Sequence, residues 1–292
     1  MSLSLGQKAG WGLADMGIVV FVIVKQLLIL AFMNSFLGIP IALAGAVTTA
    51  VLIFDIISDP IIGYFSDKTV SRFGRRAPWM LVGAVVLALA MIGLFAVPEN
   101  FTTNASLIWV TVFFLISTVG FTMVSIPYGA MAGEMTLDKK ERSSMTAWRM
   151  AFASLGILVG GALIPILAGD TKSGYTFAAI CVAPLIILSI WFSVFFTRKT
   201  PRTLTPSQQN FSYILKLVLA NRAFVTLVIL YGIMTLAIAL ITAGLPFAAM
   251  YLILDDGDSL LSGVAKGLGT LSLMFAAFVI GSIISQALWV KL

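Results

Sequence analysis

The sequence predicts an all-α protein that crosses a membrane several times, and three observations lead to this fold class. Hydrophobic residues make up 60% of the 292 residues and charged residues only 10%, which is more apolar than a soluble protein of this length needs. The apolar residues form runs of about 20 or more, the length of a transmembrane helix. The charged residues gather in the short segments between these runs.

Eight of the apolar runs are long enough to span a bilayer. Short loops join the first six, and a polar, proline-containing stretch at 198–210 separates them from the last two. The predicted spans are 11–36, 41–66, 77–98, 104–134, 143–168, 173–197, 223–253 and 265–290.

Lysine and arginine are concentrated in every second loop. Because basic loops stay on the cytoplasmic side, the N-terminus is expected in the cytoplasm and the protein in the cytoplasmic (inner) membrane. The basic residues of these loops are Lys68, Arg72, Arg75, Arg76, Lys139, Lys140, Arg142, Arg198, Lys199, Arg202, Lys216 and Arg222.

The pattern divides the chain into three predicted parts. Residues 1–197 form a six-helix bundle, and 198–222 form a cytoplasmic linker with an amphipathic surface helix around 211–218. Residues 223–292 form a partial second bundle of two helices. Since six spans followed by two is an incomplete arrangement, the chain is expected to be truncated at its C-terminus.

Several function classes are excluded by composition. The chain has no histidine and one cysteine, Cys181, which removes histidine acid–base chemistry, Cys/His zinc sites and internal disulfides. No nucleophile motif occurs, so neither an enzyme nor a cofactor is expected. The net charge of +6 arises from loop residues that set topology, so a nucleic-acid partner is not expected either.

Two carboxylates, Asp55 and Asp59, lie within the second predicted span. A charge at mid-bilayer costs roughly 3 kcal/mol or more, so such residues are usually functional. Four residues apart on a helix, they share one face at about 6 Å. They therefore need a shared cation, a proton or a basic partner, which indicates a transporter.

The loop between the second and third spans combines glycine, aspartate and arginine. Glycine allows close helix approach, and the aspartate can pair with arginines that also bind carboxylates and helix C-termini. This pattern resembles the cytoplasmic-loop signature of the major facilitator superfamily, whose six-helix halves rock around a central cavity. The resemblance implies one complete half, about two helices of the second, and a conformational role for Gly63, Asp67, Arg72, Gly74, Arg75 and Arg76.

Further motifs resemble the glycoside–pentoside–hexuronide:cation symporters, the family of the melibiose permease. They lie at 54–63, 72–79, 125–128 and 136–142. The resemblance implies a cation site made of Asp55 and Asp59 with hydroxyl oxygens from Ser58 and Thr122. Such oxygens suit sodium or lithium and can also hold a proton.

In that family the sugar site uses acids on the first and fourth helices and an arginine on the fifth. Asp15 and Arg149 match two of these, and the two are expected to form an ion pair unless both extend to the interface. Ser125 stands in place of the fourth-helix acid and Gly129 in place of an aromatic residue. These changes weaken the case for a galactoside.

Lys25 lies about 21 Å along the first span from Trp11, near mid-bilayer and at a depth similar to that of Asp55. Two hypotheses remain open. In the first hypothesis, its ammonium contacts Asp55 or Asp59 and partly replaces a metal cation, which favours proton coupling or uniport. Alternatively, it faces the cavity and binds an anionic substrate such as a uronate.

Two structural motifs complete the predictions. Gly156 and Gly160 form a GxxxG pair of the kind that packs membrane helices closely. Trp11, Trp79, Trp109 and Trp289 are placed like interface anchors.

The expected function is cation-coupled symport of a sugar or glycoside by alternating access. The partners are a small-molecule substrate, a coupling cation (Na⁺ or H⁺) and the lipid bilayer, and the resemblance implies a monomer. The alternatives are a facilitator for an amphiphilic lipid or drug-like molecule, and a fragment that does not transport.

Overall fold

The computed structural model describes residues 3–198, 200, 220–251, 273, 276–277 and 280–281. Within these ranges the protein is helical without strands, and seven helices are long and apolar enough to cross a membrane. These seven correspond to the first seven predicted spans. The eighth span and the surface helix at 211–218 lie largely or wholly outside the described residues, and the three-part division of the chain stays a prediction.

The first span is one continuous rod with a π-helical turn in its middle, and the fifth span has the same construction. The remaining spans are single α-helices. In order the elements are α1 (Leu5–Ile23), η1 (Val24–Leu28), α2 (Ile29–Ser35), α3 (Ile41–Lys68), α4 (Ala77–Phe95), α5 (Thr103–Met135), α6 (Lys139–Leu158), η2 (Val159–Leu163), α7 (Ile164–Ala168), α8 (Lys172–Thr197) and α10 (Arg222–Tyr251).

Local sequence explains where several helices begin and where the chain reverses. Ser4 and Gln7 form a capping box at the start of α1, and the Asp138 carboxylate accepts from two backbone amides at the start of α6. The chain turns at Gly38 and Gly169, whose φ angles of +63° and +54° disfavour residues with a side chain.

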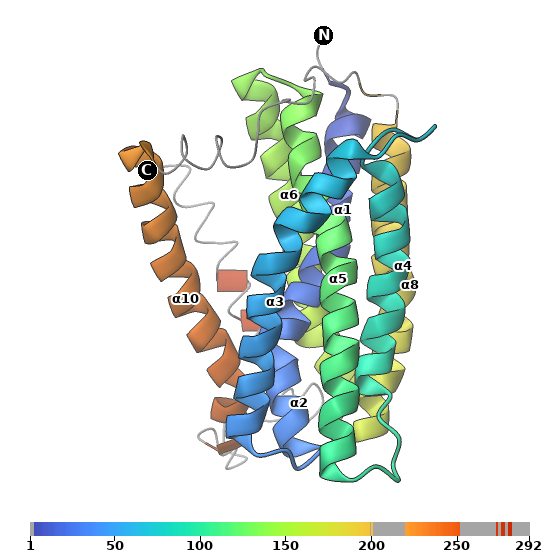
Figure 1. The fold of residues 1–292 in the computed structure, drawn as a ribbon, viewed down its shortest axis with the longest axis vertical. Helices are drawn as coiled ribbons and strands as arrows, with labels where there is room; N and C mark the ends of the chain where they lie inside the picture. The colour runs from blue at the N-terminus through green and yellow to red at the C-terminus, as the bar shows by residue number, and fades with distance from the viewer. Residues whose placement is uncertain are drawn as a thin grey trace.

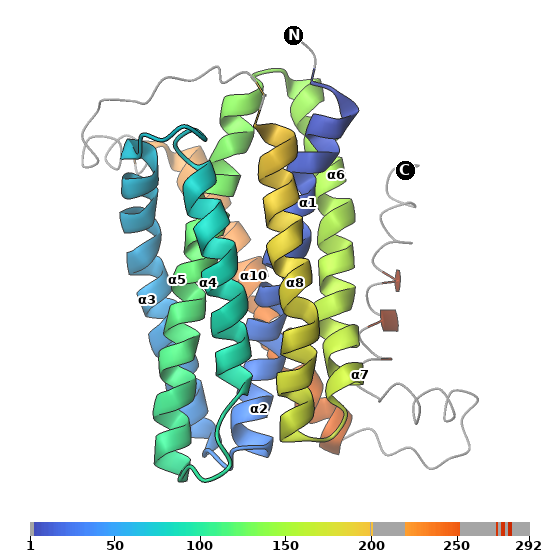
Figure 2. The same cartoon turned by 90° about the vertical axis from the view of Figure 1, so that its right-hand side faces the viewer.

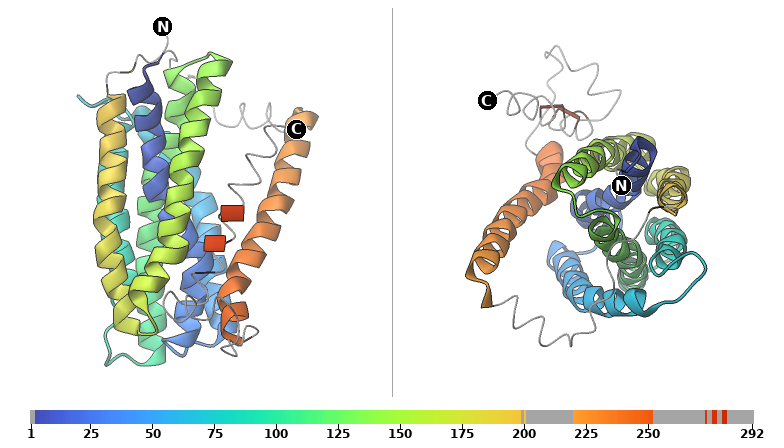
Figure 3. Two further views of the ribbon diagram at one scale, coloured as in Figure 1. Left: turned by 180° about the vertical axis from the view of Figure 1, so that it is seen from behind. Right: turned by 90° about the horizontal axis from the view of Figure 1, so that it is seen from above.

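The first six spans pack into one bundle, and α10 stands beside it (Figures 1 and 3). α1 packs against α6 and α8, α4 packs against α5 and α8, and α3 packs against α5 at the edge. α10 contacts the bundle at η1 and α2. The start of α1, the connections after α3 and α5, and the C-terminal end of α8 lie at one end of the bundle (Figure 2), so the two described basic loops share one side as predicted.

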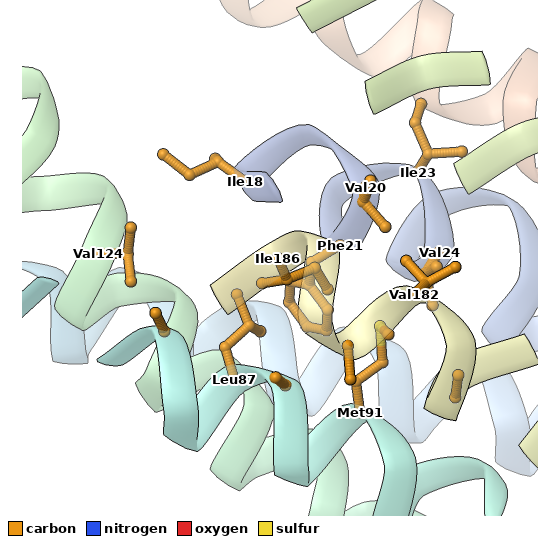
Figure 4. Packing of buried hydrophobic residues seen from close by; sticks show 14 of the residues in the cluster. Ile18, Val20, Phe21, Ile23, Val24, Leu87, Met91, Val124, Val182 and Ile186 are labelled. Carbon is orange, nitrogen blue, oxygen red and sulfur yellow. The ribbon is translucent and has the colours of Figure 1, made fainter. Parts of the chain in front are cut away.

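α1 is central to the core. Its Phe21 packs among Leu87 and Met91 of α4 and Ile186 of α8, all of them fully buried (Figure 4). Two-thirds of the apolar window of the first span is buried, more than in any other described span. Because interiors are close-packed, side chains on this helix have well-defined positions.

The predicted GxxxG pair is confirmed as a contact between the fifth span, where Gly156 lies in α6 and Gly160 in η2, and the first span. A Cβ atom added at Gly156 would lie 2.5 Å from the Met16 carbonyl oxygen, and one at Gly160 would lie 2.9 Å from Ile23 Cβ. Any larger residue at these positions would push the two helices apart.

Candidate functional site

The predicted pair of Asp15 and Arg149 is present and joins α1 to α6. Arg149 Nε donates to Asp15 Oδ2 at 3.0 Å. Gly12 makes this approach possible, because a Cβ there would lie 2.9 Å from the Arg149 backbone nitrogen. Asp15 is 2% exposed, so neither residue follows the alternative of extending separately to the interface.

The two partners of this pair differ in their surroundings. Asp15 Oδ1 is buried and accepts no hydrogen bond from the described residues, whereas the Arg149 side chain is 40% exposed. The pair therefore has an open side, on the arginine, and an unused acceptor on the carboxylate.

Lys25 and Asp55 form a second intramembrane pair, which joins the first span to α3. Lys25 Nζ donates to Asp55 Oδ2 at 2.7 Å. The Lys25 side chain is 17% exposed and that of Asp55 14%. The structure thus brings Lys25 to one of the two predicted carboxylates, and Lys25 itself lies in the π-helical turn η1, a type of distortion often found at functional sites.

The other predicted cation-site residues lie around this pair but do not all point into it. Thr122 Oγ1 donates to Asp55 Oδ1 at 3.2 Å. Ser58 Oγ instead donates to the Asp55 backbone carbonyl at 3.1 Å, so its hydroxyl is used within its own helix. Asp59 lies within electrostatic range of Asp55 and Lys25, and its Oδ1 is buried with no hydrogen-bond donor in the described part of the chain.

This arrangement does not fit a bare metal ion as it stands. Both Asp55 carboxylate oxygens accept from protein donors. Hard cations need several oxygen ligands at once. The assignment of Asp55, Ser58, Asp59 and Thr122 as metal ligands stays a prediction.

Ser125 and Gly129 lie on α5 beyond Thr122. Ser125 is half-buried and makes no hydrogen bond to Asp15 or Arg149, so it is not brought into that pair. A Cβ atom at Gly129 would meet no heavy atom within 4 Å. Open space therefore remains where the family resemblance implies an aromatic side chain.

Trp11 is not the interface anchor that its position suggested. It is 3% exposed, stacks on Tyr128 with ring centroids 4.7 Å apart, and donates from Nε1 to the Tyr128 carbonyl oxygen at 3.3 Å. The Arg149 guanidinium lies 5.6 Å from the Tyr128 ring centroid. The sequence analysis assigned no role to Tyr128, although its place three residues after Ser125 was a usable signal.

The loop motif forms an ion-pair cluster at the basic end of the bundle. Arg76 contacts Asp67 at 3.0 Å and Glu134 at 3.2 Å, and Arg75 contacts Glu134 at 2.9 Å. Glu134 is 5% exposed and was missed by the sequence analysis. An acid at the loop end of an apolar helix, facing a basic loop, was the signal that could have found it.

Three further residues of the loop motif, Gly74, Gly63 and Arg72, differ in the contacts they make and in whether the structure requires them. Gly74 has φ +94° and needs to be glycine for that reason. A Cβ at Gly63 would make only an ordinary contact, 3.4 Å from Ile126, so the predicted close approach is not needed there. Arg72 is exposed and lies over the Phe73 ring at 4.8 Å rather than in an ion pair.

Comparisons with known proteins agree with this architecture. The model of the MFS/sugar transport protein family matches residues 10–291. A putative glycoside/cation symporter, YagG, of Escherichia coli is 30% identical over 202 residues, 68% of this chain and 44% of the relative. The inner membrane symporter YicJ of E. coli is 28% identical over 216 residues, 71% of this chain and 47% of the relative.

The uncharacterized symporter YjmB of Bacillus subtilis is 29% identical over 238 residues, which is 78% of this chain and 51% of the relative. The chain spans about half the length of these curated relatives. With the family model matching almost the whole chain and seven membrane-length helices described, this is a multi-pass membrane protein that belongs to the MFS/sugar transport protein family, a family of transporters and not of enzymes.

Proposed function

We propose that the protein acts in secondary active transport of a sugar or glycoside across the cytoplasmic membrane, coupled to a cation and working by alternating access. The observation that carries this proposal is a pair of intramembrane ion pairs, Asp15–Arg149 and Lys25–Asp55, on one central helix of a transporter-family bundle. Charged side chains inside a membrane are costly and mark substrate and ion pathways.

The first pair suits the substrate. A carboxylate accepts hydrogen bonds and a guanidinium donates several, and together they match the hydroxyl groups of a polyol. The 40% exposed Arg149 side chain and the open space at Gly129 are the features that a bound sugar would use. Substrate would add hydrogen bonds without first breaking the pair.

The second pair suits the coupling cation. Asp55, Asp59 and Lys25 together carry two negative charges and one positive charge, so one negative charge is left without a compensating partner among them. A cation arriving there removes the net charge and lowers the cost of closing the site to water. Either Na⁺ or H⁺ would supply that charge.

Coupling between the two sites follows from their common helix. Asp15 and Lys25 lie about 15 Å apart along the same rod, which is the most buried of the described spans. A ligand that holds this rod in one position at either site favours the same position at the other. Such a linkage is reciprocal: the cation raises sugar affinity by the factor by which sugar raises cation affinity.

The cluster of Arg75, Arg76, Asp67 and Glu134 keeps the bundle rigid while it moves. It ties the end of α3, the start of α4 and the end of α5 together. The six-helix bundle can then rock as one body.

Uptake into proteoliposomes containing the full chain tests the proposal. The panel contains neutral glycosides, uronates and an amphiphilic lipid, each supplied with and without a cation gradient. We expect accumulation of a polar sugar that falls at least tenfold in Asp15→Asn and Arg149→Lys and is unchanged in the loop control Asp170→Asn. Uptake of the lipid without any sugar, or no uptake of any sugar in the panel, would contradict the proposal.

A further inference from the structure

We propose that Lys25 is a tethered cation: its ammonium occupies the position on Asp55 that a metal ion would otherwise take, and so excludes sodium from the Asp55–Asp59 site. This deepens the proposed function and rests on it, because it concerns the ion specificity of the same site. It also resolves the two hypotheses for Lys25 in favour of the charge substitute.

Direct contact is the first support. The 2.7 Å separation of Lys25 Nζ and Asp55 Oδ2 is that of a charge-assisted hydrogen bond. An ammonium and a sodium ion both carry one positive charge and both satisfy a carboxylate. With side chains only 17% and 14% exposed, few water molecules can compete with the lysine for the carboxylate oxygen.

The backbone of Lys25 is held firmly, which is the second support. Its neighbours Val24, Leu27 and Leu28 in the π-helical turn are fully buried. Gly160 of η2 packs closely against the helical turn that precedes Lys25, so the two π-helical turns η1 and η2 lie side by side. The ring of Phe121, with its centroid 5.9 Å from Nζ, adds a cation–π contact. These contacts hold the ammonium beside Asp55.

The remaining oxygens form too small a set for a metal, which is the third support. The Thr122 hydroxyl donates to the other Asp55 oxygen and also lies within hydrogen-bonding range of the Asp59 side chain, and the Ser58 hydroxyl is directed at a backbone carbonyl. Asp59 alone retains a buried carboxylate oxygen with no donor in the described residues. One carboxylate does not replace the several oxygens that a hard cation requires. Removing the lysine would free Asp55 and restore a two-carboxylate site.

The test is thermal stability of the purified full chain in sodium against potassium chloride, at equal ionic strength and fixed pH. Wild type and the control Lys172→Met, whose lysine binds a loop carbonyl far from the site, should have the same Tm in both salts. Lys25→Met should have a lower Tm in potassium and gain about 3–5 °C for each tenfold excess of sodium over its Kd. Adding Asp59→Asn should abolish that gain.

Two results would overturn the proposal: a sodium-specific rise in Tm of wild type that Asp59→Asn removes, or a folded Lys25→Met protein with no response to sodium. If Lys25→Met does not fold, equilibrium binding of radioactive sodium to wild type decides. No saturable binding is expected, and binding that Asp59→Asn removes would contradict the proposal.

The outcome is separable from that of the proposed function. A sodium response gained by Lys25→Met in a protein that takes up no sugar would retain this proposal and refute sugar transport. Sodium-dependent sugar uptake by the wild-type protein would support sugar transport and refute the exclusion of sodium by Lys25.

Discussion

The two ion pairs on the first span differ in a way that assigns them different tasks. In Asp15–Arg149 the carboxylate is buried and the arginine side chain is 40% exposed, so one partner is open to a ligand. In Lys25–Asp55 both side chains are similarly enclosed, and the ammonium makes further contact with an aromatic ring. An open pair can add hydrogen bonds to a substrate, whereas an enclosed pair keeps its charges in place.

The largest effect is expected when the enclosed pair is broken on one side. Lys25→Met should destabilise the protein by about 3–5 kcal/mol, since Asp55 is left without its partner, and Asp55→Asn by less, because Asp59 stays within electrostatic range of Lys25. The double variant Lys25→Met/Asp55→Asn should recover most of that loss, because neither charge remains. Denaturation of the three variants forms a double-mutant cycle, and additive losses would show that the pair does not act as a unit.

The open pair should be less sensitive. Asp15→Asn is expected to cost about 1–3 kcal/mol of stability, because the exposed Arg149 can be solvated when its partner is lost. Sugar affinity should fall at least tenfold in the same variant. Stability and sugar binding are measured on one preparation, and a stability loss as large as that of Lys25→Met would remove the contrast between the pairs.

Overpacking at the contact between α1 and α6 is expected to have a smaller effect on stability than loss of either ion pair. A Cβ at Gly156 would lie 2.5 Å from Met16 O, so Gly156→Ala forces α1 and α6 apart between the two pairs. Overpacking costs about 1–3 kcal/mol, offset by about 1 kcal/mol of helix propensity. The net loss should be about 0–2 kcal/mol, with Gly232→Ala, in open space, as the matched control that loses none.

The smallest effect is expected at the end of the bundle. Asp67, which pairs with Arg76, has a side chain 53% exposed, and exposed pairs contribute about 0–1 kcal/mol. Asp67→Asn should therefore change the free energy of unfolding by less than about 1 kcal/mol. A larger loss in chemical denaturation would mean that the cluster around Glu134 depends on Asp67.

The two intramembrane pairs were anticipated in different ways, Asp15–Arg149 from the family resemblance and Lys25–Asp55 as one of two open hypotheses. A charge in an apolar span has few possible partners, and helix rise places Lys25 and Asp55 at the same depth. The seven described spans and the glycine contact at Gly156 followed from equally general constraints. These features depend on spacing along one helix or on the thickness of the bilayer.

Features that depend on tertiary contact were missed. A tryptophan near a helix end suits a membrane interface as well as a buried stack, so Trp11 was placed wrongly. The π-helical turn around Lys25 and the double pairing of Glu134 leave no periodic signal. The Ser58 hydroxyl could have faced the cation site or its own helix, and only the backbone geometry of α3 decides.

Equilibrium binding of a transported sugar to wild type, Asp15→Asn and Lys25→Met tests most directly whether the two pairs have separate tasks. The predicted result is at least a tenfold loss of affinity in Asp15→Asn, with sugar binding retained in Lys25→Met and made sensitive to sodium. Binding that survives Asp15→Asn but is lost in Lys25→Met would contradict the assignment. It would make Lys25 the substrate-binding residue, as expected for an anionic sugar.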